Sequence, residues 1–297
     1  MLSPFLQHTL ARPARVAGTG IHSGQMARVV VRPAQPGAGV VFVRTDITDR
    51  DNRIAARAQA VRYTDLGTVI GNAAGVTVST IEHLMAALAC LGVDNAVVEI
   101  DGPEAPILDG SAAPFVAALD RAGRRVQQAP RRYLEILAPV VVGDGDKTAA
   151  LTPAERFEVA FEILFDSPAI GRQTIDLAVD EASFRRELAD CRTFGFLAEV
   201  EALTAAGFAR GGSLDNVVVV DGDLIINPEG LRRPDEFVRH KAVDAIGDLA
   251  LLGAPLLGRY EGRYSGHGLN NALARALIAR PHTWRLAPLR DDLAEAI

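Results

Sequence analysis

This chain of 297 residues has few cysteines, no net positive charge and no long apolar run, and each absence excludes a class of protein. Only two cysteines occur, Cys90 and Cys191, and neither has a C-x-x-C partner. Their number excludes a disulfide framework and a thiolate zinc cluster, and it suits a reducing compartment. We interpret Cys191 as a small buried apolar residue rather than as a nucleophile.

The net negative charge limits which ligands the protein can bind. The formal net charge is -6 at pH 7, whereas proteins that bind nucleic acid draw much of their affinity from a broad basic surface. We therefore expect no nucleic-acid partner. Local basic clusters can still bind a phosphorylated small molecule.

No apolar run is long enough to cross a membrane. The longest, residues 249–258, is interrupted by Pro255 and falls far short of the roughly 20 residues that a spanning helix needs. The N-terminus also lacks a basic segment followed by a long apolar run, so the sequence predicts no secretory signal. We expect a soluble, cytoplasmic protein without a transmembrane segment.

Hydrophobic residues make up 48% of the chain, which is enough for one large domain or two smaller ones. Short apolar runs separated by turn residues predict antiparallel strands over residues 10–44. The polar, proline-containing segment 127–132 predicts a linker. On each side of it, strands precede a helix that carries a histidine beside carboxylates. We predict two α+β domains, residues 1–127 and 128–297.

The second of these helices, expected over residues 237–251, has the most informative spacing. His240, Asp244 and Asp248 lie four residues apart, which places them on one helix face. Phe237 and Leu251 share that face, so we expect it to be covered. A buried histidine with two carboxylates needs a partner such as a cation, although an ordinary solvated polar stripe remains the alternative.

The helix expected over residues 79–88 brings a glutamate and a histidine together. Ser79 and Glu82 fit a capping box, which would explain the glutamate structurally. His83 has no such explanation. A glutamate next to a histidine at a helix start can also deliver a general base and a metal ligand to one site.

Three histidines are therefore candidates for a site: His83, His240 and His267, the last in a loop bracketed by glycines. Two histidines and one carboxylate would leave a zinc coordination position open for water, as hydrolysis requires. His22 lies in a glycine-rich turn and is left outside the site.

Six motifs carry a family resemblance. In order they are T-I-E-H-L-M-A-A-L, D-G-S-A-A-P-F, R-T-F-G-F, G-G-S-L-D-N, E-F-V-R-H-K-A-V-D-A-I-G-D-L and S-G-H-G-L-N-N. Together with G-T-G-I-H-S-G near the N-terminus, they are distributed from there to Asn271, over nearly the whole chain. The sequence resembles the UDP-3-O-acyl-N-acetylglucosamine deacetylases, which remove acetate at an early step of lipid A synthesis in Gram-negative bacteria.

The resemblance implies a zinc site and a catalytic machinery. The zinc ligands would be His83, His240 and Asp244, although this ligand set also suits Fe2+. Glu82 would be the general base, and His267 the general acid or electrostatic catalyst. Asp248 would orient His267, and Thr193 would help to hold the developing oxyanion.

The resemblance also implies how substrate is held and how the chain folds. Lys241 and Phe194 match positions near the nucleotide sugar, and Leu66 and Gly212 match positions that line the site. The family fold is α+β: two similar domains, each a sheet with helices packed against it, and the helices sandwiched between the two sheets. The partner would be the small-molecule substrate, acylated UDP-N-acetylglucosamine, and the protein a monomer.

The sequence departs from the family pattern at one position. Tyr264 stands in Y-S-G-H, where some members carry a lysine near the diphosphate. Two alternatives to the deacetylase stay open at this point. One is a non-catalytic protein of the same fold that binds a sugar nucleotide or an acyl chain, and the other is a zinc amidase with another substrate.

Overall fold

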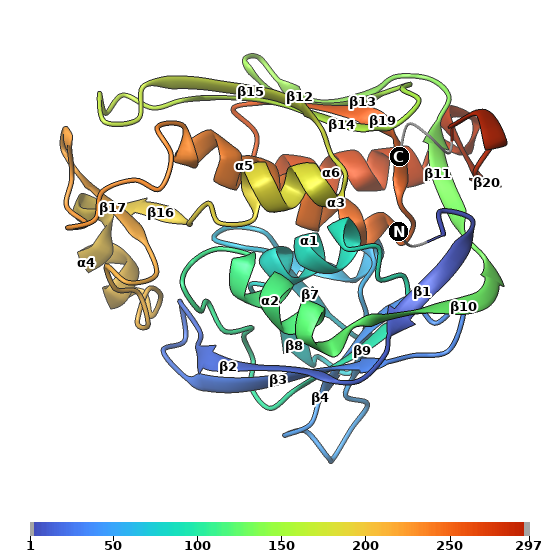
Figure 1. The fold of residues 1–297 in the computed structure, drawn as a ribbon. Coiled ribbons are helices and arrows are strands. Elements are labelled where there is room, and N and C mark those ends of the chain that lie inside the picture. The colour runs from blue at the N-terminus through green and yellow to red at the C-terminus, as the bar shows by residue number, and fades with distance from the viewer. Residues whose placement is uncertain (1–2, 294–297) are drawn as a thin grey trace.

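The computed structural model describes residues 3–293, which form five sheets and six α-helices (Figure 1). The fold is α+β, as predicted. Two of the sheets are large, and each belongs to a different half of the chain. Within residues 3–293 no helix combines the length and apolar character that crossing a membrane requires.

The first half of the chain builds a five-stranded sheet with the strand order β2-β3-β9-β4-β5. Its strands show the expected alternation: in β3, Ala27, Val29 and Val31 are buried while the residues between them are more exposed. Helix α2 packs against β2, and α1 packs against α2. The elements are β2 (Ala14–Thr19), β3 (Met26–Pro33), β4 (Val40–Arg44), β5 (Arg53–Ala55), β9 (Ala96–Ile100), α1 (Glu82–Cys90) and α2 (Ala113–Ala122).

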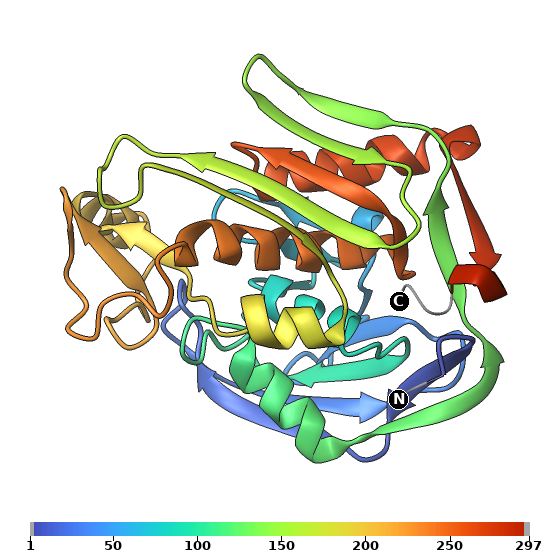
Figure 2. The ribbon, with the colours of Figure 1, turned by 45° about the horizontal axis from the view of Figure 1, so that its top comes forward.

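The second half builds a seven-stranded sheet, in which β19 pairs with β11, β13 and β14. Helix α5 packs against β14 and β15, and α6 packs against β12 and β13. Figure 2 shows this sheet lying over both helices. The elements are β11 (Arg132–Ile136), β12 (Val140–Asp144), β13 (Lys147–Thr152), β14 (Phe157–Leu164), β15 (Arg172–Ala178), β19 (Leu256–Arg263), β20 (Trp284–Pro288), α5 (Glu236–Leu249) and α6 (His267–Ile278).

The two halves meet where α1 packs against α5. Gly247 of α5 makes this contact close: a Cβ atom built on it would lie 2.1 Å from the backbone oxygen of Glu82. Only a residue without a side chain allows the helices to approach so far. The approach sets Glu82 and His83 of α1 against the polar residues of α5.

The segment 127–132, predicted as a linker, is largely a strand. β10 (Arg124–Pro130) pairs antiparallel with β1 (Leu6–Leu10), and only Arg131 separates it from β11. Gln127 explains why the linker prediction was wrong, because this polar side chain is buried and both ends of its amide are hydrogen-bonded. It accepts a hydrogen bond from Asn95 Nδ2 (2.8 Å) and donates to the Ala34 carbonyl (2.8 Å).

Two smaller sheets lie beside the large ones. The sheet β6-β7-β8 carries the loop 64–68, and the sheet β16-β17-β18 is joined through α4. No residue of α4 is buried, and in Figure 1 this helix lies at the left, beyond the ends of the large sheets. The elements are β6 (Val61–Tyr63), β7 (Val69–Gly71), β8 (Thr77–Val78), β16 (Phe194–Phe196), β17 (Val218–Asp221), β18 (Leu224–Ile225) and α4 (Leu197–Ala205).

Most predicted helices are present with shifted ends. The helix expected over 237–251 runs from Glu236 to Leu249 and continues as a 3-10 turn, Ala250–Leu252. Residues 181–188 form the short α3 (Glu181–Ser183) followed by a π-helical turn, Phe184–Leu188. His267 was expected in a loop, but it is the first residue of α6.

Candidate active site

His83, His240 and Asp244 form a compact buried group at the α1–α5 contact. One ligand atom from each residue lies within 4.8 Å of the others. His240 Nε2 is 3.3 Å and His83 Nε2 is 3.6 Å from Asp244 Oδ1. The two imidazole rings stand edge to face, with centroids 4.9 Å apart. The three side chains therefore point at one shared position, as ligands of a single ion would.

His240 is held in the form that binds a metal. Its Nδ1 lies 3.0 Å from the carbonyl oxygen of Cys191, so Nδ1 carries the proton and Nε2 presents a lone pair to the group. Burial lowers the pKa of His240 to about 4, which keeps the ring neutral at physiological pH. Two imidazoles and one carboxylate, all buried, are a donor set that fits a catalytic zinc ion.

Lys241 compensates the charge of Asp244. Its ammonium group donates a hydrogen bond to Asp244 Oδ2 at 2.8 Å. Burial would raise the pKa of Asp244, but Lys241 and then His240 outweigh it and hold that pKa well below its usual range. Asp244 is therefore ionised and able to serve as a ligand.

Glu82 is not part of a capping box, so the structural alternative for this glutamate does not hold. The residue that caps α1 is Ile81, without a side-chain hydrogen bond, and the Ser79 hydroxyl donates to the Pro103 carbonyl instead (3.2 Å). The Glu82 carboxylate accepts the backbone N–H of Thr68 at 3.0 Å. Burial raises the pKa of Glu82, which makes this carboxylate a stronger base than a free one.

Asp248 and His267 form a second pair next to the metal-binding group. Asp248 Oδ2 accepts from His267 Nδ1 at 2.8 Å and from Asn270 Nδ2 at 2.9 Å. Burial opposes a charge on His267, but Asp248 and then Asp244 outweigh it and raise the pKa of His267 to about 9. The imidazole is therefore protonated at neutral pH.

His267 reaches toward both Glu82 and the group of His83, His240 and Asp244. Its Nε2 lies 3.9 Å from Glu82 Oε1 and 3.9 Å from Asp244 Oδ2. The His267 side chain is 12% exposed and that of Lys241 is 18% exposed, whereas Glu82 is 4% exposed. Solvent thus reaches the cluster on the side of His267 and Lys241.

Four further predicted residues lie at different distances from this cluster. The ring of Phe194 packs edge to face on Phe237 and lies 6.4 Å, centroid to centroid, from His240. Thr193 is its neighbour in the chain, and the Thr193 N–H donates to the Gly110 carbonyl at 2.8 Å. Leu66, 41% exposed, lies two residues before Thr68, which touches Glu82. Gly212 lies in the loop 209–212, with no contact to the cluster among those the structure describes.

His22, which the sequence analysis leaves outside the site, is tied to the loops around it. His22 Nε2 lies 3.1 Å from the Leu66 carbonyl oxygen, and its ring packs edge to face on Phe208. The backbone of the same turn accepts hydrogen bonds from Arg210 and Gly211. The glycine-rich turn therefore links the loop of Leu66 with the loop of Gly212.

Sequence reasoning missed two residues that touch the cluster, Thr68 and Asn270. Asn270 lies three residues after His267, so helical spacing would have placed both on one face of α6 if His267 had been expected in a helix rather than in a loop. Thr68 has no such signal, because it lies in a loop far from its partners in the sequence.

Neither cysteine is suited to catalysis, because burial raises the pKa of both thiols. Cys191 is fully buried, and burial raises the pKa of its thiol to about 12. The thiol therefore stays protonated and unreactive. The contribution of Cys191 to the site is its carbonyl oxygen, which orients His240.

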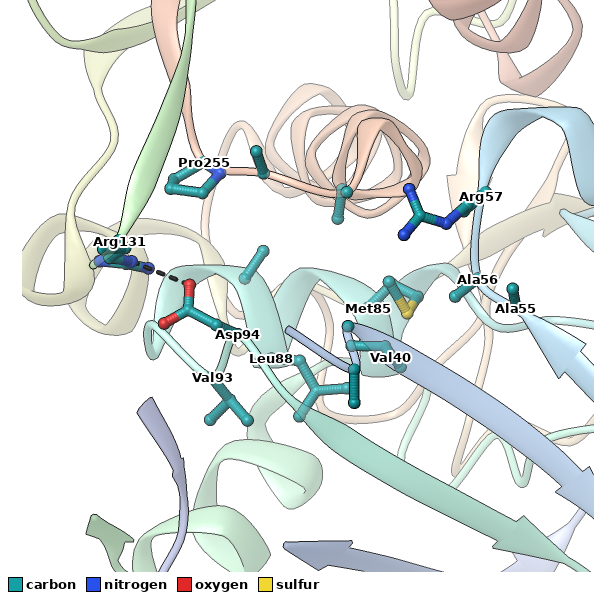
Figure 3. A pocket seen from close by; sticks show the side chains of 16 residues that line it. Val40, Ala55, Ala56, Arg57, Met85, Leu88, Val93, Asp94, Arg131 and Pro255 are labelled. Atoms are coloured by element: carbon teal, nitrogen blue, oxygen red, sulfur yellow. Dashed lines mark hydrogen bonds and ion pairs between the residues drawn. The ribbon is translucent and has the colours of Figure 1, made fainter. Parts of the chain in front are cut away.

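A cavity of about 100 Å³ lies near the end of α1, and none of the predicted site residues lines it (Figure 3). Met85 and Leu88 of α1 form part of its apolar wall, and Arg57 and Arg131 lie at its sides. Arg131 Nε pairs with Asp94 Oδ1 at 2.8 Å. The cavity is thus separate from the chemistry described above.

Comparison with known proteins places the chain in one family, because the family match and the similar proteins carry nearly the same name. Residues 7–279 match the family described as LpxC, UDP-3-O-acyl N-acetylglycosamine deacetylase. A protein of Phenylobacterium zucineum named UDP-3-O-acyl-N-acetylglucosamine deacetylase is 72% identical over 293 residues, which cover 99% of this chain and 100% of the relative. Proteins of the same name from Myxococcus xanthus (50% identical; 97% and 91% covered) and a Shewanella species (46%; 97% and 94%) are similar along almost their whole length.

Proposed function

Because this chain belongs to the UDP-3-O-acyl-N-acetylglucosamine deacetylase family, we propose that its buried cluster divides the work of N-deacetylation among a metal site, a base and an acid. The chain is a zinc-dependent hydrolase of lipid A biosynthesis. Its substrate is UDP-3-O-acyl-N-acetylglucosamine, and acetate is released. Neither a binding protein without activity nor an amidase with another substrate accounts for this membership together with a buried His-His-Asp group.

The zinc ion would be held by His83, His240 and Asp244. In its bound state zinc supplies Lewis acidity, which polarises the amide carbonyl and makes water more acidic. The three residues give an ion three protein ligands and leave room for a non-protein one. Since imidazole and carboxylate donors also suit Fe2+, we extend the proposal to either metal.

Glu82 takes the proton of the attacking water. Support comes from its position beside His83, its burial, and a pKa raised by that burial. The Thr68 N–H holds Oε2, so Oε1 is the oxygen that faces His267 and the reacting groups. A fixed carboxylate with one free oxygen is suited to receive a proton in a defined direction.

His267 supplies positive charge and a proton on the other side of the reacting amide. Its protonated ring, held through Nδ1 by Asp248, presents Nε2–H toward the group. This proton stabilises the oxyanion that develops when the amide is attacked, and it then passes to the departing amine. Asp248 acts through His267 by fixing its orientation and favouring its charged form.

The remaining predicted residues would hold the substrate. Lys241, charged and partly exposed at the open side of the cluster, would meet the nucleotide sugar together with Phe194. Leu66 and Gly212 would line the entrance, since the turn of His22 links their loops. We also propose that the Thr193 hydroxyl joins His267 in holding the oxyanion.

Tyr264 makes contacts within the protein instead of supplying the positive charge that a lysine at this position would. Its hydroxyl donates to Glu162 Oε1 at 2.9 Å, and the Arg263 guanidinium lies 5.1 Å from its ring centroid. We therefore propose that charge for the diphosphate comes from elsewhere in the chain.

We further propose two similar domains, residues 1–127 and 128–297, with the helices sandwiched between their sheets, in a cytoplasmic monomer.

One observation carries the assignment of roles: the convergence of Glu82, the His-His-Asp group and His267 within about one side-chain length. The test measures acetate release from acylated UDP-N-acetylglucosamine by the zinc-loaded protein, with the deacetylated sugar nucleotide as the blank. Loss of activity on chelation and its return with zinc support the proposal. Full activity of the metal-free protein contradicts it.

A further inference from the structure

Thr68 touches both the base and the acid of the site through two different groups. Its backbone N–H donates to Glu82 Oε2 at 3.0 Å, and its hydroxyl donates to Asp248 Oδ1 at 2.5 Å. The hydroxyl oxygen is also 3.4 Å from His267 Nδ1. Thr68 itself is 2% exposed. A single buried residue therefore links groups that act on opposite sides of the reacting amide.

The contacts of Asp248 show what the hydroxyl adds. Asp248 Oδ2 is already engaged by His267 and Asn270, so Oδ1 has the Thr68 hydroxyl as the donor that the structure describes for it. A buried carboxylate oxygen without a donor is costly. If Thr68 lost its hydroxyl, Asp248 would be free to rotate toward other donors, and the direction of the His267 ring would change with it.

Thr68 also connects the two halves of the chain. It belongs to the loop between β6 and β7, whereas Asp248 and His267 lie 180 and 199 residues further on, in α5 and α6. Glu82 belongs to the same half as Thr68. The loop thus sets the position of the acid pair of one half relative to the base of the other.

We propose that Thr68 is a positioning residue for deacetylation, which acts through Asp248 to fix His267 opposite Glu82. This inference rests on the proposed roles of Glu82, Asp248 and His267. Threonine suits the task because its short side chain has one hydroxyl and a branched Cβ, which restricts the rotamer. Valine keeps this shape and the backbone N–H but removes the hydroxyl.

The experiment compares four variants of the zinc-loaded enzyme: Thr68→Val, Thr68→Ser, Asp248→Ala and the double variant Thr68→Val/Asp248→Ala. Zinc per chain, melting temperature, kcat and KM on acylated UDP-N-acetylglucosamine are measured for each. Thr283→Val is the matched control, because Thr283 is also buried and donates through its hydroxyl, but to the Arg280 carbonyl (2.7 Å).

Thr68→Val is expected to lower kcat about 10- to 100-fold, as loss of a hydrogen bond to a charged group does. KM and zinc content are expected to stay near the wild-type values, because the partners of the hydroxyl, Asp248 and His267, are neither proposed metal ligands nor proposed substrate-holding residues. Thr68→Ser keeps kcat within about threefold, and so does the control. In the Asp248→Ala background, Thr68→Val costs less than about threefold more, because the two residues act through one contact.

Three results would overturn the inference: a wild-type kcat in Thr68→Val, an equal loss in Thr68→Ser, or the full loss again in the Asp248→Ala background. The first excludes a role for the hydroxyl, the second assigns the effect to packing of the methyl group, and the third separates Thr68 from Asp248. If Asp248→Ala alone is fully active, the proposed role of Asp248 fails instead, so the two failures are distinguishable.

Discussion

Asp248 and His267 come from different helices, α5 and α6, and meet through a 2.8 Å contact between Asp248 Oδ2 and His267 Nδ1. Asp248 also accepts a hydrogen bond from Asn270, which follows His267 by one helical turn. The carboxylate therefore fixes the direction of the imidazole and favours its charged form, and we expect this pair to determine how activity depends on pH.

We predict a bell-shaped pH profile of kcat/KM. The acid limb reports Glu82, which must be ionised, and the basic limb reports His267, which must be protonated. Burial opposes the charge of His267, but Asp248 and Asp244 raise its pKa to about 9, so kcat/KM should fall as pH rises through about 9. Removing Asp248 removes the nearest negative charge, so Asp248→Ala should shift the basic limb to lower pH.

His267→Ala is the control for this assignment. The variant should retain zinc and have much lower activity, and the basic limb should be weakened or absent. A basic limb that persists unchanged in His267→Ala would show that another group titrates there.

Replacement of a metal ligand should remove both metal and activity. We expect His83→Ala, His240→Ala and Asp244→Ala each to lower metal affinity and activity. The decrease should exceed the roughly 10- to 100-fold that follows when only the orienting partner of a ligand is removed. Metal per chain and acetate release are measured on the same preparations. His282→Ala, a change at an exposed histidine, is the matched control and should alter neither. Full metal retention in all three ligand variants would refute the assignment.

Replacement of the base should separate catalysis from metal binding. Glu82→Ala and Glu82→Gln should retain zinc but lose about 100-fold or more in kcat, as removal of a general base does. Glu82→Gln keeps an oxygen that can accept the Thr68 N–H, so its melting temperature should lie closer to the wild type than that of Glu82→Ala. Zinc loss in Glu82→Gln would instead make Glu82 a ligand.

The buried pair of Arg192 and Glu236 should be important for stability. Arg192 is 1% and Glu236 0% exposed, and Arg192 Nε donates to Glu236 Oε1 at 2.9 Å. Arg192→Met leaves a buried carboxylate without this partner, so we expect a loss of about 3–5 kcal/mol in the free energy of unfolding. Denaturant unfolding measures it.

Arg259→Met provides the matched comparison, because Arg259 pairs with Asp176 and Glu261, both well exposed. Solvent screens these pairs, so the loss should be about 0–1 kcal/mol. Equal losses in the free energy of unfolding for the two arginine variants would show that burial does not make the ion pair of Arg192 more important for stability.

The sequence predicted the central part of the site because regular spacing encodes it. His240, Asp244 and Asp248 repeat every four residues, and the covered helix face that this spacing indicates is observed. Glu82 and His83 are neighbours in the chain, so their proximity needed no tertiary information. The family resemblance added the roles, which spacing alone does not give.

Other features depend on contacts that local sequence does not encode. The capping box at Ser79 and Glu82 has the right spacing, but the Ser79 hydroxyl donates to the Pro103 carbonyl and the Glu82 carboxylate accepts from Thr68. Gln127 looks like part of a polar linker, yet it is buried in β10 because Asn95 and Ala34 satisfy its amide. In each case a residue distant in the sequence decides the outcome.

The separation of Thr68 from Asp248 by 180 residues has a consequence for synthesis on the ribosome. A nascent chain folds from its N-terminus as it emerges, so the half that carries Glu82 and His83 can pack its own sheet while α5 and α6 are still untranslated. Until those helices pack against this half, Glu82, His83 and the face of α1 that later contacts Gly247 have no cover from α5. The proposed catalytic group therefore stays incomplete until α5 and α6, which carry His240, Asp244, Asp248 and His267, have been synthesised and α5 has packed against α1.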